Sequence, residues 1–386
     1  MSAKFKQTEI GLIPDDWEVK DIDSIATIET GSCNTQDKID DGDFPFFVRS
    51  SIIERINSYS FDGEAVLTAG DGVGTGKVFH YINGKFDYHQ RVYKISNFAK
   101  GVSGYFFYLY FSNFFYNRIT QMTAKTSVDS VRREMISNMK IPIPPLPEQT
   151  AIVAALSDTD NYISSLEKLI EKKRLVKQGA MQDLLKPKKG WINKKLGDIA
   201  QIRDGTHQTP SYVEAGVPFY SVENVTNNDF INTKFISEEA HSILTKKYHI
   251  EKDNILMTRI GSIGVCKLVG WESNASFYVS LALLKINNEI SPEYIYQYSK
   301  TKQFKIEILN HSLLNATPQK INLGNISLID IKLPPKYDEQ TAIATILSDM
   351  DNEITALEKK LAKAQLIKQG MLQQLLTGKI RLEGKS

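Results

Sequence analysis

Apolar side chains recur at alternating steps of four and three along two stretches of the chain, residues 148–185 and 339–376. This spacing is typical of the a and d positions of a heptad repeat, in which one narrow apolar stripe runs along an α-helix. Each stretch covers 38 residues and predicts a helix about 57 Å long at ~1.5 Å per residue. A helix of that length needs a partner that covers its stripe.

The seam of the two predicted helices is apolar with a few polar interruptions. Its positions are Ile152, Leu156, Ile163, Leu166, Ile170 and Leu184 in the first helix, and Ile343, Leu347, Met350, Ile354, Leu357, Leu361, Met371 and Leu375 in the second. Gly179 and Gly370 lie inside the pattern at matching places, where alanine would favour the helix by roughly 1 kcal/mol. We expect a close crossing or a bend there.

Both helices begin with related sequences. Residues 144–152 read Pro-Pro-Leu-Pro-Glu-Gln-Thr-Ala-Ile, and residues 334–343 read Pro-Pro-Lys-Tyr-Asp-Glu-Gln-Thr-Ala-Ile. The copies stay in step at an offset of 191 residues as far as the Lys-Gln-Gly sequences at 177–179 and 368–370. The chain therefore contains a tandem duplication. Prolines before each helix predict a stiff, extended start.

The heptads alone are consistent with a coiled coil that only oligomerises the protein. However, both helices belong to one chain, and about 150 residues precede each of them. The two helices can therefore pair with each other within one molecule.

The region before each helix alternates short apolar runs with glycine-led polar loops, which predicts a β-rich unit with a few helices. Residues 105–117 and 292–308 are the best candidates for helices in these regions. The two halves share this pattern, whereas their loop residues differ. Similar scaffolds with different loops indicate two related binding surfaces with different targets.

The composition excludes little. The chain has 386 residues, a net charge of +2 and 41% hydrophobic residues, which suits a soluble protein with two compact domains. No apolar run approaches the ~20 residues of a membrane span, and no signal-peptide core follows Met1, so we expect a cytoplasmic protein. The two cysteines, Cys33 and Cys266, have no metal-ligand spacing, so neither a disulfide framework nor a zinc site is expected.

Basic residues are concentrated in one segment. Residues 168–195 hold ten lysines and arginines against two acidic residues. Such a run is either a solvated helix face followed by a basic linker, or a patch that faces phosphates or a partner. The sequence leaves both interpretations open.

Catalytic motifs are missing from the sequence. The glycine-rich run at 70–78 differs from a Walker loop, which needs glycine at Asp71 and a hydroxyl at Val78. The six histidines are scattered, and neither a nucleophile elbow nor the Asn/Asp-Pro-Pro motif of amino-methyltransferases occurs. We therefore predict a chain without catalytic residues, metal ligands or a bound cofactor.

What remains is a set of polar and basic loop side chains, of the types that read base edges and hold phosphates. In the first half the candidates are Ser32, Asn34, Gln36, Arg49, Lys77, His89, Gln90, Arg91, Lys125, Thr126, Ser127, Arg132 and Arg133. In the second half they are Thr206, His207, Gln208, Thr209, Ser211, Tyr212, Asn224, Arg259, Ser262, Lys267, Asn315, Thr317, Gln319 and Lys320. Each of these alone is also an ordinary solvated loop residue, so the set is a hypothesis about DNA contact.

Taken together, the chain closely resembles the specificity subunit of type I restriction-modification systems. The resemblance rests on the duplicated helix starts at 144–152 and 334–343, on Lys-Gln-Gly at 177–179 and 368–370, on the terminal Leu-Leu-Thr-Gly-Lys-Ile-Arg at 375–381, and on Asp-Gly-Thr-His-Gln-Thr-Pro at 204–210. It covers essentially the whole chain. The first half has a different sequence, Gly-Ser-Cys-Asn-Thr-Gln-Asp, at the corresponding loop, 31–37.

The resemblance implies an α+β fold with pseudo-two-fold symmetry, in which two β-rich target recognition domains are joined by two long antiparallel helices that form an intramolecular coiled coil. The implied segments are recognition domain 1 at 1–143, helical spacer 1 at 144–187, recognition domain 2 at 188–333 and helical spacer 2 at 334–386. Each recognition domain would read one half of a split, asymmetric sequence in double-stranded DNA.

The same resemblance implies the partners. Two methyltransferase subunits would dock on the helices, and restriction subunits would complete the nuclease. S-adenosylmethionine, Mg²⁺ and ATP would be used by these partners, and no cofactor would be bound by this chain. The competing interpretation is a coiled-coil scaffold that does not contact DNA, which the unequal loops argue against.

Overall fold

The computed structural model describes residues 4–122, 130–246, 249–313 and 316–382. Its contacts form two compact units, one of Met1–Glu167 with Lys360–Ser386 and one of Lys168–Lys359. Each unit therefore combines a β-rich domain body with about half of each long helix. The body is the part of a unit that lies outside the two long helices. This grouping cuts across the four predicted segments, because helix residues such as Leu156 and Leu347 belong to the cores of the bodies.

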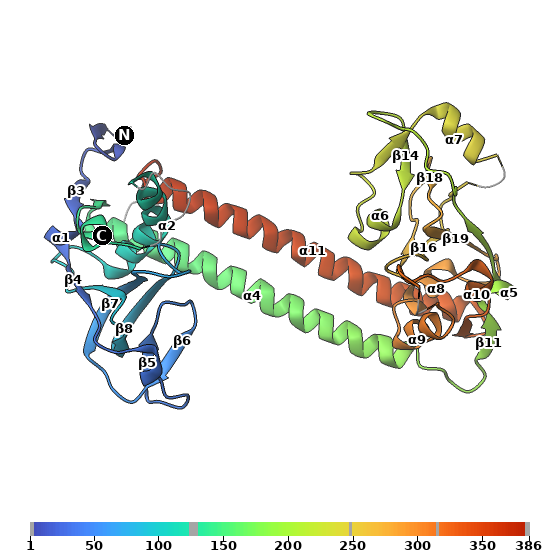
Figure 1. Ribbon diagram of the computed structural model, residues 1–386, viewed down its shortest axis with the longest axis horizontal. Coiled ribbons are helices and arrows are strands. Elements are labelled where there is room, and N and C mark those ends of the chain that lie inside the picture. Colours follow the sequence, from blue (N-terminus) through green and yellow to red (C-terminus); the bar gives the residue numbers. More distant parts are fainter. Residues whose placement is uncertain (1–3, 123–129, 247–248, 314–315, 383–386) are drawn as a thin grey trace. The chain divides into compact units, whose positions relative to one another are not determined.

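The first unit contains a six-stranded sheet in the order β4-β9-β7-β8-β5-β6 and two small ladders, β1-β2 and β10-β3 (Figure 1). Its elements are β1 (Phe5–Thr8), β2 (Gly11–Pro14), β3 (Glu18–Asp21), α1 (Ile22–Ile25), β4 (Thr27–Thr30), a 3-10 turn (Thr35–Asp37), β5 (Phe44–Phe47), β6 (Ile53–Ile56), β7 (Phe61–Ala69), β8 (Phe79–Tyr88), β9 (Val92–Ser96), α2 (Gly104–Met122), α3 (Arg133–Ser137), β10 (Lys140–Ile143) and the start of α4 (Leu146–Leu184).

The second unit contains two four-stranded sheets, β12-β19-β16-β17 and β13-β15-β14-β18, and the ladder β11-β20. Its elements are β11 (Ile192–Lys195), α5 (Leu196–Ile199), β12 (Ala200–Asp204), β13 (Tyr212–Val213), β14 (Val217–Tyr220), α6 (Val222–Asn227), β15 (Lys234–Ile236), α7 (Glu238–Leu244), β16 (Ile255–Thr258), β17 (Cys266–Leu268), β18 (Ser276–Phe277), β19 (Leu281–Ile286), α8 (Pro292–Tyr298), α9 (Lys302–Asn310), α10 (Leu323–Ser327), β20 (Asp330–Leu333) and the start of α11 (Tyr337–Leu375).

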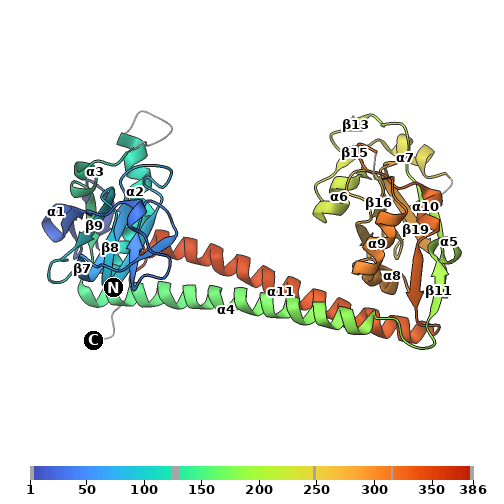
Figure 2. The same cartoon turned by 60° about the horizontal axis from the view of Figure 1, so that its bottom comes forward.

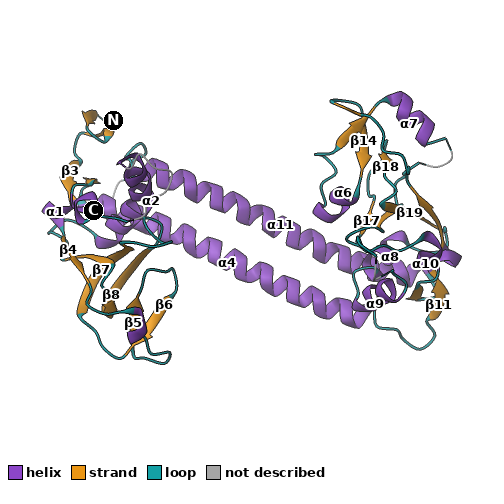
Figure 3. Cartoon of the chain, in the orientation of Figure 1, coloured by secondary structure: helices purple, strands orange, loops and turns teal. Residues whose placement is uncertain are grey.

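The two bodies are variants of one arrangement (Figure 3). In the first, the ten-residue β8 pairs with β7 along one part and with β5 along another, so one sheet results. In the second, the corresponding strand is divided into β17, which pairs with β16, and β18, which pairs with β14. The sheet is therefore split in two.

The central strand of each body is buried on both faces. Along β7, Val66 packs in the cluster that contains α2, whereas its neighbours Ala65 and Leu67 pack in a separate cluster. Along β16, Met257 and Leu256 likewise belong to different clusters. Successive strand residues point to opposite faces, so a continuous apolar run is what a strand covered on both sides requires.

The two long helices match the heptad prediction closely, with 39 residues each. Every predicted seam residue is buried or half-buried. In the first unit, Thr159 contacts Met371 and Asp160 binds Lys368. In the second, Lys173 binds Glu353 and Lys177 binds Asp351. Within each unit the helices therefore run antiparallel, side by side (Figure 2). No described helix is long and apolar enough to cross a membrane.

A buried glutamine lies at the start of each long helix. Gln149 is fully buried, donates to the carbonyls of Gly101 and Pro144, and accepts from the amide of Ser103, all at 2.8 Å. Gln340 repeats the contact, donating to Pro334 and accepting from the amide of Ser291, both at 2.9 Å. The glutamine thus fastens each long helix to its domain body.

Two expectations from the sequence are wrong. Of the close crossing or bend expected at Gly179 and Gly370, a close crossing within the described chain is wrong, because a side chain at either position would meet nothing within 4 Å. The expected single helix at 292–308 is interrupted after Tyr298, because Thr301 accepts a hydrogen bond from the amide of Phe304 and starts a new helix, α9. The expected helix at 105–117 is present as α2 and extends to Met122.

Candidate DNA interface

In the first unit, three loops meet at one end of the large sheet: residues 31–37, 70–78 and 89–91. Gly31 lies so close to the end of β8 that an added Cβ would be 1.9 Å from the carbonyl oxygen of Tyr88. The amide of Gln90 donates to the carbonyl of Cys33 at 2.9 Å, and the amide of Gly70 donates to the carbonyl of Arg91 at 2.8 Å. Backbone contacts therefore hold the three loops together, and we call this arrangement the loop junction.

One carboxylate at these loops binds two arginines. Asp71 accepts from Arg49 at 2.9 Å and from Arg91 at 2.6 Å. Burial acts to raise the pKa of Asp71, but the hydrogen bonds from the two arginines outweigh it and hold the pKa below the usual value of 3.8. Asp71 is thus ionised at neutral pH, and both guanidinium groups keep exposed surface that faces solvent.

The second unit builds the same junction from residues 205–212, 259–264 and 278–280. An added Cβ at Gly205 would be 2.0 Å from the carbonyl oxygen of Phe277. The amide of Val279 donates to the carbonyl of Thr206 at 3.0 Å, and the amide of Arg259 donates to the carbonyl of Ser280 at 2.9 Å. Glycine is needed at the first loop of each unit because only a residue without Cβ allows this approach.

Asp204 takes the role of the linking carboxylate here. It contacts His207 at 2.8 Å and Arg259 at 3.3 Å. The side chain of Arg259 is only 11% exposed and also donates to the carbonyls of Val279 and Ile321. Arg259 therefore positions the loops, and it is not free to read a base.

Most of the candidates chosen from the sequence lie on the surface around these junctions. The exposed or half-exposed ones are Ser32, Asn34, Gln36, Arg49, Lys77, Gln90, Arg91, Arg132, Arg133, Thr206, His207, Gln208, Thr209, Ser211, Tyr212, Ser262, Thr317, Gln319 and Lys320. A fourth segment joins the second junction, because the amide of Gly261 donates to the carbonyl of Gln319 at 2.8 Å. Lys125, Thr126, Ser127 and Asn315 lie outside the described residues.

Three other candidates have internal roles. Asn224 is 7% exposed; its side chain accepts from the amide of Ser221 and donates to the carbonyl of Asp229. His89 is 4% exposed, and its Nδ1 accepts from the amide of Arg91. Lys267 is half-buried and donates to Asn228 at 2.6 Å. Asn224 and His89 are thus unavailable for base contacts in this structure.

Three residues of the junctions were not predicted from the sequence: the linking carboxylates Asp71 and Asp204, and Tyr278, whose hydroxyl lies 3.2 Å from that of Thr209. An acidic residue next to glycine in each loop was the available signal, since Asp71 and Asp204 both adjoin a glycine. The complete arrangement presents exposed amides, hydroxyls and cations on a fixed backbone. Such groups can hydrogen-bond base edges and phosphates.

Comparisons with known proteins identify the family. Residues 14–175 and 188–366 match the family model described as the type I restriction modification DNA specificity domain. The chain is 25% identical to the putative type I restriction enzyme MjaX specificity subunit of Methanocaldococcus jannaschii, covering 98% of this chain and 97% of that protein. It is 27% identical to the MjaVIII specificity subunit of the same organism, covering 69% of this chain and 68% of that protein.

A solved structure shares the fold. The S subunit of a type I restriction-modification system from M. genitalium superposes with a TM-score of 0.64 at 19% identity, covering 97% of this chain and 99% of that one. The duplicated match of the family model covers most of the chain in two successive copies, as the tandem repeat predicted. This chain therefore belongs to the type I restriction modification DNA specificity family and is a specificity subunit.

Proposed function

We propose that each unit reads one half of a split, asymmetric sequence in double-stranded DNA, and that the chain itself is not catalytic. The observation that carries this proposal is the loop junction, which is built twice from corresponding, though not identical, backbone contacts and with different exposed side chains. One framework with two sets of hydrogen-bonding groups suits the recognition of two different base sequences. The partner subunits would then supply the chemistry, with S-adenosylmethionine, Mg²⁺ and ATP.

The test is to express the chain with its methyltransferase and to map methylated bases by methylome sequencing. The complex is expected to methylate one bipartite motif, and the purified chain alone is expected to turn over no S-adenosylmethionine. Crosslinking tests whether this chain contacts DNA in the complex. If the complex forms and methylates DNA but this chain does not crosslink to it, the scaffold interpretation is favoured.

Loop substitution separates the two half-sites. Replacing Gln208, Thr209 and Gln319 with alanine is expected to relax or change only the half-site read by the second unit, because these side chains are exposed while Asp204 and Arg259 still hold the loops. Removing one side chain that hydrogen-bonds a base pair should cost about 1 to 3 kcal/mol of discrimination at that pair.

The matched variant in the first unit replaces Gln36 and Gln90 with alanine; both are also exposed. It is expected to affect only the other half-site. A change in both halves of the motif after either substitution would contradict the separate reading of half-sites.

For the partners, we propose that two copies of the methyltransferase subunit dock on a stripe that occurs once in each unit. The stripe consists of Lys172, Leu175, Val176 and Gly179 in the second unit, and of Lys363, Leu366, Ile367 and Gly370 in the first. Residues at this spacing share one helix face. The four large apolar side chains are between 49% and 69% exposed, and the glycines meet nothing within 4 Å. Close approach of another helix would account for both features.

Charge substitution in one stripe is expected to remove one partner copy. Leu175→Glu with Val176→Glu places carboxylates in an apolar contact, at a cost of about 3 kcal/mol or more, which lowers affinity at least roughly 100-fold. Native mass spectrometry should then show one methyltransferase per chain. Leu366→Glu with Ile367→Glu should have the same effect, whereas Ile243→Glu, at an exposed site on α7, should keep two copies. Two copies on either stripe variant would refute the assignment.

A further inference from the structure

The second unit contains a basic cleft that the proposed half-site reading does not use. The cleft has a volume of about 740 Å³ and lies between the last third of α4, the start of α9 and the first half of α11. Six lysine and arginine side chains line it, against a single carboxylate, that of Asp351. It includes part of the basic run at 168–195, whose role the sequence left open.

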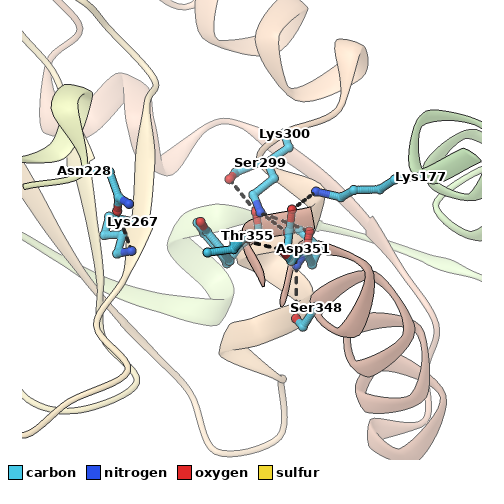
Figure 4. Close-up of polar contacts among 10 residues, drawn as sticks. Lys177, Asn228, Lys267, Ser299, Lys300, Ser348, Asp351 and Thr355 are labelled. Atoms are coloured by element: carbon cyan, nitrogen blue, oxygen red, sulfur yellow. Dashed lines mark hydrogen bonds and ion pairs between the residues drawn. The ribbon is translucent and has the colours of Figure 1, made fainter. Parts of the chain in front are cut away.

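Three of these six cations form ion pairs within the chain. Lys177 and Lys300 both bind Asp351, and Figure 4 shows the two ammonium groups converging on that carboxylate. Arg174 pairs with Glu358 at 2.6 Å. Burial acts to raise the pKa of Asp351, but the hydrogen bonds from the two lysines lower it below its usual value, so the carboxylate is charged at neutral pH.

Three lysines of the cleft keep their charge available. Lys186, Lys302 and Lys305 are exposed, and none forms an ion pair with a described residue. The cleft also contains the first turn of α9, a nine-residue helix whose N-terminus is capped by Thr301. The N–H groups of a first helical turn carry partial positive charge and favour anions. The cleft therefore presents exposed ammonium groups around a fixed positive helix end.

The cleft continues toward the loops that are proposed to read DNA. A neighbouring cavity of about 520 Å³ shares Lys300 and Lys305 with the cleft and reaches the glycine loop at residues 263–266. That loop lies directly on α9, since an added Cβ at Gly264 would be 2.9 Å from the side chain of Ile308. A DNA strand in contact with the glycine loop would thus have a positively charged path beside it.

Among its described residues, the first unit lacks the lysine-bearing turn that lines this cleft. Its helix α2 continues without a break where the second unit has the turn between α8 and α9. The only basic residue of α2 is Arg118, which donates to the carbonyl of Asn138 at 2.7 Å. The turn with its lysines therefore distinguishes the second unit from the first.

We propose that this cleft binds a backbone phosphate of the DNA next to the half-site read by the second unit, through Lys186, Lys302, Lys305 and the start of α9. The inference rests on the proposed function, because it assumes that the chain binds DNA. A phosphate contact carries no base information. It strengthens binding to all sequences alike and makes binding more sensitive to salt.

The test uses the complex of the full chain with its methyltransferase. In the variant, Lys186, Lys302 and Lys305 are replaced with glutamine; in the control, Lys194, Lys332 and Lys336, which are exposed in the same unit away from the cleft, are replaced in the same way. DNA affinity is measured by fluorescence anisotropy between roughly 50 and 200 mM salt. Thermal unfolding establishes that both proteins fold.

The slope of log affinity against log salt is expected to fall by about 0.9 for each phosphate that the variant no longer binds. The variant should weaken equally toward cognate and unrelated DNA and should leave the methylated motif unchanged, whereas the control should keep the original slope. Neutral methylphosphonate linkages placed one at a time beside the half-site should weaken binding of the unsubstituted complex at one linkage or more, and should not weaken the variant further there.

An unchanged salt slope, or a loss of affinity confined to one DNA sequence, would overturn the proposal while leaving the half-site reading intact. If the unsubstituted complex binds no DNA at any salt concentration, the proposed function would be overturned instead. The two failures are therefore distinguishable in one set of titrations.

Discussion

A chain with one heptad added to each long helix is expected to direct methylation to a motif with both half-sites unchanged and a spacer about three base pairs longer. Both α4 and α11 pass from one unit into the other. Seven residues keep the a/d seam and add ~10 Å of helix, which corresponds to about three base pairs at ~3.4 Å each.

The insertions belong after Glu167 and after Lys359, where both helices cross from unit to unit. At these sites the register contacts remain intact, because Asp160–Lys368 lies in the first unit, and Lys173–Glu353 and Lys177–Asp351 lie in the second. Three base pairs also rotate a half-site by about 100° at 10 to 10.5 base pairs per turn. The longer complex should therefore bind its new motif more weakly than the parent binds its own.

An insertion in α4 alone is the control, and it should lower the stability of the chain because the seams no longer match. Methylome sequencing reads the spacer directly. If the doubly extended chain stays folded and active but methylates a motif with the original spacer, the helices serve only for assembly, and the spacer is set elsewhere.

Replacing Arg381 with alanine is expected to destabilise the first unit by about 3 kcal/mol. Arg381 donates to Glu148 at 2.6 Å and to Asp16 at 2.7 Å. Glu148 is 4% exposed, and after the substitution it would keep only the Trp17 indole N–H at 2.9 Å. A buried charge that loses its partner costs about 3 to 5 kcal/mol, and the lower value applies because the Arg381 side chain is 29% exposed.

Differential scanning calorimetry measures this effect. For a unit of this size, the expected fall in Tm is roughly 6 to 12 °C. Arg133→Ala is the matched control, because Arg133 and Asp23 form an ion pair in the same unit with 57% and 59% of their side chains exposed; it should change stability by less than about 0.5 kcal/mol. Equal effects of the two substitutions would contradict the role of Arg381.

The pH dependence gives a second measurement. The hydrogen bond from Arg381 is the main cause that lowers the pKa of Asp16 below 3.8. A carboxyl whose pKa is lowered by folding adds stability above its unfolded pKa, about 3.9, and this stability is lost as the pH falls through the folded value. The stability difference between the unsubstituted chain and Arg381→Ala should therefore shrink below about pH 4.

The elements that follow local periodicity could be predicted from the sequence. The seams of α4 and α11, their lengths and the duplication were predicted because a helix places residues three and four apart on one face, whatever lies beyond it. The glycine loops were also recognised, since Gly31 and Gly205 each begin a polar segment after an apolar strand.

Side-chain roles in the loops could not be predicted in the same way. Arg259 and Asn224 have the chemistry of base-reading residues, yet Arg259 bonds the carbonyls of Val279 and Ile321, and Asn224 caps its own helix. These acceptors are as many as 62 residues away along the chain. Whether a polar group is exposed or satisfied internally depends on such distant partners, which a local pattern does not contain.

The sequence by itself determined that this protein has two related halves, two long paired helices and two different sets of loop residues, because periodicity and repetition are properties of the chain. Only the tertiary structure decided which of those residues face outward, that Gln149 and Gln340 fasten the helices to the bodies, and that the lysines around α9 form a cleft. The physical reason is that burial and hydrogen bonding are set by segments brought together from far apart in the sequence.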